Sequence, residues 1–118
     1  MRMQPDPEVF DPTSALASVG GDREFLSEVA GLFQAAWPTL CNDIRAGLAA
    51  GDFGAMERSA RLVEAAARNL SARIVCESAH RLALLARQGA LEDCEAACAN
   101  LEHQVARLTP HLAPLRHP

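Results

Sequence analysis

A chain of 118 residues with 49% hydrophobic content is long enough to bury one core without disulfides or bound metal. Its net charge of -4 gives no reason to expect a nucleic acid or an anionic membrane as partner. No apolar run approaches the ~20 residues that span a bilayer, and residues 1–7 lack the apolar core of a signal peptide. We therefore expect a single-domain cytoplasmic protein.

The N-terminal part predicts a lead-in followed by a short helix. Residues 1–9 are polar and rich in proline, which favours an extended, poorly ordered segment. Thr13 or Ser14 can cap a short helix that runs to about Val19, and the glycines at 20–21 end it.

A long helix is predicted over 22–50, with Asp22 as its cap. Apolar residues recur there at three- and four-residue steps, which places on one face Leu26, Val29, Phe33, Ala36, Leu40, Ile44 and Leu48. Pro38 should kink or split this helix, because proline removes a backbone donor and crowds the preceding turn.

Three more helices are predicted over 53–70, 72–88 and 90–108, separated by Gly51-Asp52, by a turn near 69–72 and by Gly89. The same three- and four-residue spacing of apolar residues continues along these helices. The inward positions are Phe53, Met56, Ala60, Val63, Ala67 and Leu70, then Ala72, Val75, Ala79, Leu82 and Ala86, then Leu91, Cys94, Cys98, Leu101, Val105 and Leu108. Pro110 and Pro114 should prevent a regular continuation, so that 109–118 form a frayed C-terminal tail.

No stretch of useful length alternates between apolar and polar residues, as a half-buried strand would, and this argues against a sheet. Long amphipathic helices joined by short connections pair with their sequence neighbours. The predicted fold is therefore all-α: an antiparallel up-down-up-down four-helix bundle over residues 10–108 with a short N-terminal helix.

The stretch 59–72 resembles the signature helix of histidine-containing phosphotransfer (HPt) domains, whose pattern is Ala-His-x-Leu-Lys-Gly-x-Ala-x-Asn-Leu-Gly-Ala. The residues that match it are Ala60, Ala67, Asn69, Leu70 and Ala72. The flanks fit the family at the expected spacings, through Phe10-Asp11-Pro12, Gly20-Gly21-Asp22, Phe25-Leu26, Gly51-Asp52, Arg87 to Glu92 and Leu101-Glu102. The resemblance covers about 10–108 and implies an HPt-like bundle.

The positions that carry the family's chemistry differ. Arg61 stands where the phosphorylated His belongs, Glu64 where a Lys belongs and Ala65 where a Gly belongs. A guanidinium stays protonated and has no lone pair to offer to phosphorus, and Glu64 would repel a phosphate. The resemblance thus implies a pseudo-HPt module of bacterial two-component signalling, without enzyme activity or cofactor. It would dock a receiver domain or a histidine kinase without carrying phosphate at position 61.

The face around Arg61 has two explanations. Two pairs with the acid first, Glu57 with Arg61 and Glu64 with Arg68, are spaced i,i+4 and fit a solvated salt ladder with no further role. Alternatively, an exposed Arg61 enters the acidic pocket of a receiver. The candidate partner-binding residues are then Glu57, Arg58, Arg61, Leu62, Glu64, Ala65 and Arg68.

His80 offers an alternative function, because Ala79-His80-Arg81-Leu82 resembles the start of the same signature. Counting from the turn near Ser71 places His80 at about the height of Arg61 on the adjacent antiparallel helix. A phosphocarrier that uses His80 is therefore one alternative, a boundary histidine without chemistry is another, and a purely structural or dimerising bundle is a third.

A metal site is the last possibility. Cys76 and His80 share an i,i+4 face, as do Cys94 and Cys98 on the next helix, and four such ligands suit a tetrahedral ion. However, Cys94 and Cys98 follow the inward rhythm, and no CxxC pair is present. Buried free thiols are the preferred interpretation, and no metal is expected.

Overall fold

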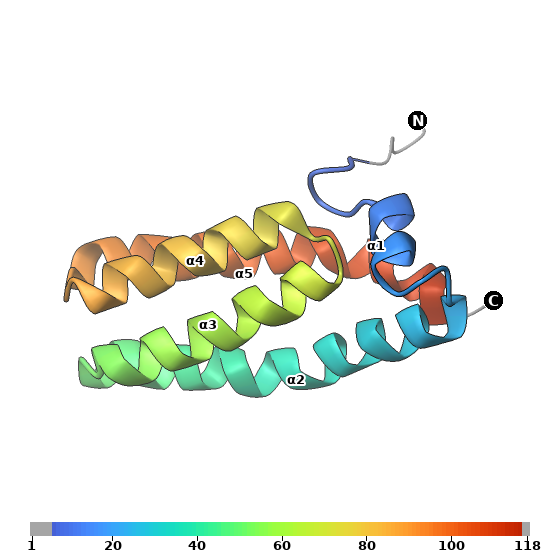
Figure 1. The fold of residues 1–118 in the computed structure, drawn as a ribbon. Helices are drawn as coiled ribbons and strands as arrows, with labels where there is room; N and C mark the ends of the chain where they lie inside the picture. Colours follow the sequence, from blue (N-terminus) through green and yellow to red (C-terminus); the bar gives the residue numbers. More distant parts are fainter. Residues whose placement is uncertain (1–5, 117–118) are drawn as a thin grey trace.

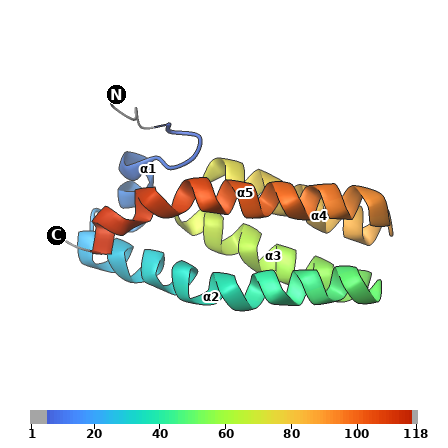
Figure 2. The ribbon, with the colours of Figure 1, turned by 180° about the vertical axis from the view of Figure 1, so that it is seen from behind.

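The computed structural model describes residues 6–116, which are all-α and globular. Five helices follow in order: α1 (Pro12–Ser18), α2 (Arg23–Ala50), α3 (Phe53–Asn69), α4 (Arg73–Arg87) and α5 (Leu91–Arg116). The long helices that follow one another pack antiparallel, and α5 also packs against α2 (Figure 1). This arrangement is consistent with a helical bundle. The short α1 lies at the end where α2 begins and α5 ends, as the view from behind also shows (Figure 2).

Aspartate side chains cap the first three helices. The carboxylates of Asp22 and Asp52 each accept a backbone N–H three residues later, at 3.0 Å, as their N-cap positions predict. The first helix begins earlier than the predicted caps imply, because Asp11 rather than Thr13 or Ser14 is its cap and Pro12 is its first residue. Gly51 ends α2 with a φ of 68°, a left-handed conformation that suits glycine.

Pro38 was expected to kink or split its helix, and Pro110 and Pro114 were expected to end theirs. The predicted split and the predicted end were wrong. α2 is continuous through Pro38, and α5 continues through Pro110 and Pro114 to Arg116, so that 109–116 are helical rather than frayed. All three prolines lie on exposed positions of their helices, away from the packed core. Leu112 is fully buried, and its packing holds the final turns of α5 in place.

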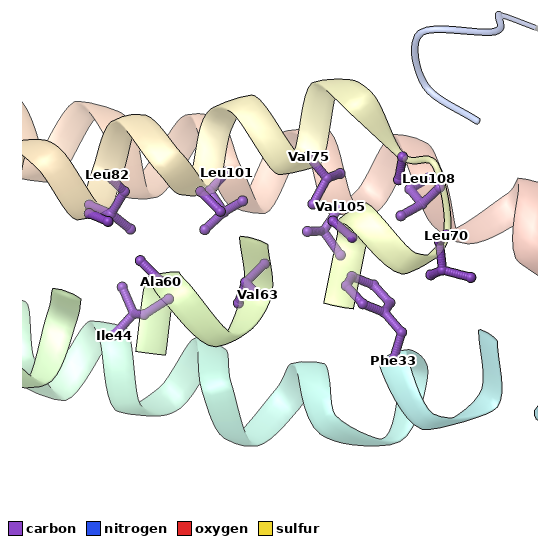
Figure 3. Close-up of a cluster of buried hydrophobic side chains, with 14 of the residues drawn as sticks. Phe33, Ile44, Ala60, Val63, Leu70, Val75, Leu82, Leu101, Val105 and Leu108 are labelled. Carbon is purple, nitrogen blue, oxygen red and sulfur yellow. The ribbon is translucent and has the colours of Figure 1, made fainter. Parts of the chain in front are cut away.

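The core runs along the axis between the long helices (Figure 3). The predicted core residues Phe33, Val63, Leu82, Cys98 and Leu101 are all buried, which confirms the register of their helices. Among the positions predicted to face inward, Ala36 and Leu91 are exposed. Those that are only partly buried are Val29, Leu40, Leu48 and Phe53.

In α2, Ala30 and Gly47 take buried positions that the simple spacing missed. A side chain at Gly47 would place its Cβ 2.9 Å from Cγ of Met56, so α2 and α3 approach closely there. Within residues 6–116, no helix is long and apolar enough to cross a membrane.

The start of the chain is packed rather than extended. Asp6 to Phe10 form a turn in which the carbonyl of Asp6 accepts the N–H groups of Val9 and Phe10, both at 3.0 Å. Val9 and Phe10 are buried, and the carbonyl of Glu8 accepts the N–H of Ile74 at 3.0 Å. The expected poorly ordered lead-in is therefore wrong for residues 6–9, and its residues 1–5 lie outside the described part of the chain. A core contact outweighs the polar composition of this segment.

Candidate functional site

The residue that organises the candidate site is Glu64, in the middle of α3. Its side chain is only 10% exposed, and both carboxylate oxygens are bound. Oε1 accepts a hydrogen bond from Nη1 of Arg61 at 3.0 Å, and Oε2 accepts one from Nη2 of Arg68 at 3.2 Å. Oε2 also lies 2.9 Å from Nδ1 of His80, which comes from α4. One buried carboxylate thus joins two helices and three basic side chains.

The charge of Glu64 is stabilised by these partners. Burial alone would raise the pKa of the Glu64 carboxyl, whereas the hydrogen bond from Arg61 and the charge and hydrogen bond of His80 lower it. The net result is a pKa below the usual value of 4.5, so that Glu64 is ionised at neutral pH. A buried carboxylate is tolerable here because it is paired on both oxygens.

The hydrogen-bond roles at His80 follow from the chemistry of Glu64. An ionised carboxylate only accepts hydrogen bonds, so the ring nitrogen 2.9 Å from Oε2, Nδ1, must carry the proton. Nη1 of Arg61 also approaches this nitrogen, at 3.1 Å. These are then two donors that share one carboxylate, not a bonded pair. In the neutral imidazole, the lone pair is left on Nε2, and the His80 side chain is 49% exposed.

The structure brings together only some of the predicted partner-binding residues. Arg61, Glu64 and Arg68 form the cluster with His80, while the pair of Glu57 with Arg61 is longer, at 3.9 Å. His80 does lie beside Arg61, as the count from the turn predicts. The exposed residues of the predicted surface that stand outside this ion cluster are Arg58, Leu62 and Ala65.

Two expectations for this face were wrong. Arg61, expected to be exposed, is partly buried, with 36% of its side chain accessible. Glu64, expected in a solvated ladder, is buried. Both differences have one cause, since α4 packs against this side of α3 and covers it. The pairing of Glu64 with Arg68 itself is confirmed at 3.2 Å, but one end of it is shielded from water.

A groove of about 500 Å³ begins beside this cluster. Arg68 and Cys76 line it on one side, and Pro7, Glu8 and Asp11 line it on the other. Arg68 therefore borders both the groove and the ion cluster. The groove carries charges of both signs and no buried polar side chain without a partner, within residues 6–116.

The cysteines are free thiols. Cys94 and Cys98 are buried as the inward rhythm predicts, and Cys41 and Cys76 are partly buried. Burial raises the pKa of Cys76, Cys94 and Cys98, which keeps these thiols protonated. Across the described ranges, 6–116, no group of three or more His, Cys, Asp or Glu side chains is placed to hold a metal ion.

Sequence reasoning missed a second ionic cluster, between α2 and α5. Glu102 accepts hydrogen bonds from Arg45 and from Sγ of Cys41, the latter at 3.0 Å. These residues lie far apart in the chain and belong to no recognisable spacing. The only available signal was that each stands beside an inward position of its helix.

Comparison of the chain with models of known protein families, with curated proteins and with solved structures finds no match. The function must therefore be inferred from the residues of the site.

Proposed function

We propose that this protein is an HPt-like up-down-up-down four-helix bundle that docks a receiver domain or a histidine kinase without carrying phosphate at position 61. The proposal rests on the position of Arg61 and on the contact of its guanidinium. This side chain occupies the phosphoacceptor position of the resembled signature, and its guanidinium is bound to Glu64. It offers no nucleophilic lone pair, while the helix that carries it remains on the surface of the bundle.

The surface beside Arg61 supports docking. Leu62 is 59% exposed and offers an apolar contact to a partner, as other large apolar side chains do elsewhere on the surface. Arg58 and Arg68 are exposed on the same helix, and their charge complements the acidic pocket expected in a receiver domain. An apolar centre with basic residues around it therefore remains where the resemblance places the partner.

The test of docking is the charge reversal Arg61→Glu. We expect it to weaken binding of a cognate receiver by ~1–3 kcal/mol, and more strongly at low salt than at high salt, because like charges then meet in the interface. Titration of candidate receivers at two ionic strengths measures this, and circular dichroism checks the fold. The matched control is Arg73→Glu on α4, where the arginine side chain is 71% exposed and lies outside the cluster. Equal affinities of wild type and Arg61→Glu would refute docking through this face.

A second candidate function is a phosphocarrier that uses His80, and the contact of Nδ1 with Glu64 favours it. The lone pair of Nε2 would attack the phosphorus of a receiver's aspartyl phosphate. The N–P bond forms while the acyl P–O bond breaks, and its electron pair returns to the aspartate carboxylate. The ring then carries a positive charge and keeps its proton on Nδ1, where Glu64 stabilises it.

Incubation with a phosphorylated receiver, or with acetyl phosphate as a small acyl phosphate, tests the carrier. The carrier function predicts an acid-labile, base-stable label that disappears in His80→Ala and persists in His103→Ala, since His103 is an exposed histidine on α5. Absence of label on the wild-type chain, with receivers that it binds, would exclude the carrier and leave docking alone.

A further inference from the structure

The departures from the resembled signature are not scattered. Arg61 and Glu64 replace the residues that carry the family's chemistry, and both lie within 3.1 Å of the same ring nitrogen of His80. Arg68 reaches the same carboxylate at 3.2 Å. The polar residues of this face therefore form one connected cluster that includes His80.

We propose that Glu64 is a positioning residue that fixes the tautomer and orientation of His80, so that Nε2 is the reactive nitrogen presented to solvent. The inference deepens the second function proposed above and rests on it only for the identity of the electrophile, an acyl phosphate. The tautomer itself is a property of the free protein and can be measured without any partner.

Three features of the cluster support this role. Glu64 comes from a different helix than His80, so the hydrogen bond fixes the ring against the frame of the bundle. Its carboxylate is held in turn by Arg61 and Arg68, one at each oxygen, which prevents it from rotating away. The carboxylate is buried while the ring is 49% exposed, so the fixed end of the imidazole faces inward and the other end reaches solvent.

A purely structural salt bridge differs from a positioning residue in its consequence for reactivity. In either role the hydrogen bond to Glu64 holds the proton on Nδ1, because an ionised carboxylate only accepts. The tautomer therefore tests whether Glu64 controls the ring, and the reactivity of Nε2 tests whether that control matters.

The experiment is ring-nitrogen NMR of the ¹⁵N-labelled full-length protein at an alkaline pH where imidazole rings are neutral. In the wild type, we expect His80 to show a protonated Nδ1 and an unprotonated Nε2. The exposed His103 serves as an internal reference and should show averaging between both tautomers. Averaging at His80 in the wild type would overturn the inference.

Glu64→Ala sharpens the test. Without the carboxylate, the neighbour left at Nδ1 is Nη1 of Arg61, which can only donate. The proton of His80 should then move to Nε2, inverting the tautomer, and the double variant Glu64→Ala/Arg61→Ala should average. Glu64→Gln keeps the side-chain volume and should shift the tautomer part of the way if the alanine variant is poorly folded. The matched control is Glu77→Ala on α4, whose carboxylate pairs with Arg73 and not with His80. An unchanged tautomer in both Glu64 variants would refute the proposal.

Reactivity provides an independent measurement. Carbethoxylation of His80 by diethyl pyrocarbonate should occur at Nε2 and should slow by about tenfold in Glu64→Ala, the loss expected for a hydrogen bond to a charged group, relative to His103 in the same sample. Unchanged relative rates would contradict the positioning role. A fixed tautomer with no phosphoryl label from any receiver keeps the positioning role and removes the carrier. A phosphoryl label at His80 that does not change in the Glu64 variants keeps the carrier and removes the positioning role.

Discussion

Two glutamates bridge helices at opposite seams of the bundle, and their neighbours make them different. Glu64 joins α3 to α4 and binds an imidazole, whereas Glu102 joins α5 to α2 and binds the thiol of Cys41. Both also accept hydrogen bonds from an arginine, namely Arg61 in one case and Arg45 in the other. The two seams thus contain the same bridge with a different potential nucleophile at its end.

The difference teaches what an acidic neighbour does to each nucleophile. Burial, together with the hydrogen bond and charge of Glu102, raises the pKa of Cys41 to about 11. The thiol has one reactive atom, and holding a proton on it makes that atom unreactive. Imidazole has two nitrogens, so holding a proton on Nδ1 of His80 leaves Nε2 free. The same bridge therefore silences Cys41 and orients His80.

The charges of Glu64 and Glu102 are tolerated because basic side chains pair with them. Val63→Asp is the most severe test of this dependence. This change places a further carboxylate on α3, one residue before Glu64, but at a fully buried position among apolar side chains (Figure 3). We expect a loss of about 3–5 kcal/mol in the free energy of unfolding, because the charge has no partner. Urea unfolding measures the loss. Leu62→Asp, at the exposed neighbouring position, should cost less than about 1 kcal/mol. Similar stabilities for the two variants would show that the register of α3 is wrong.

The thiol side of the comparison is tested by alkylation of Cys41. With a pKa of about 11 in place of the ordinary 9.0, its thiolate fraction at neutral pH is about a hundredfold lower than that of a free thiol. We expect the rate of iodoacetamide modification at Cys41, followed by mass spectrometry, to rise with a midpoint near that value. Glu102→Gln should lower the midpoint, although burial keeps it above 9.0. A midpoint at or below 9.0 in the wild type would contradict the silencing of this thiol.

The carboxylate side is tested by the pH dependence of Glu64→Gln. Because the folded-state pKa of Glu64 lies below the usual 4.5, its charged form contributes stability above that value. The contribution is lost as the pH falls through the folded-state pKa. We expect the variant to be less stable by ~1–2 kcal/mol at neutral pH and the difference to vanish in strong acid. Unfolding measured across this range tests the sign, with Glu77→Gln as the exposed control. A difference that persists unchanged in acid would show that the charge of Glu64 is not responsible.

The smallest effect separates a shielded ion pair from an exposed one. Arg68 pairs with buried Glu64 in the last turn of α3, where a positive charge is favourable. Arg73 pairs with exposed Glu77 in the first turn of α4, where a positive charge is unfavourable. We expect Arg68→Ala to cost ~0.5–1 kcal/mol and Arg73→Ala almost nothing in thermal or urea unfolding. Equal losses would mean that the burial of Glu64 does not strengthen its pairs.

Much of the fold could be predicted from local chemistry. Asp22 and Asp52 cap their helices and Gly51 ends one, because each effect acts within a few residues. The prolines misled because the rule against them ignores packing. Pro110 costs a hydrogen bond on the exposed side of α5, while Leu108 and Leu112 hold the opposite side in the core. A local penalty was therefore outweighed by contacts that no local pattern reveals.

The candidate site was predictable in position but not in character. Counting from the turn placed His80 beside Arg61, because antiparallel neighbours have a simple register. The burial of Glu64 was not predictable, since its spacing to Arg68 is identical to that of an exposed pair. Glu64 is buried because it lies on the side of α3 that α4 covers. Which side is covered depends on the rotation of the two helices about their axes.

The contact between Glu8 and Ile74 has a consequence for the order of folding. α4 has no side chain that caps its first turn, and the carbonyl of Glu8 serves instead, while Asp6 reaches Arg107 on α5 at 3.6 Å. Contacts so distant in sequence form late, because closing a long loop costs entropy before any contact repays it. We expect the first turn of α4 to remain frayed until the start of the chain has docked. Amide hydrogen exchange at Ile74 would then report how often that segment detaches from the folded bundle.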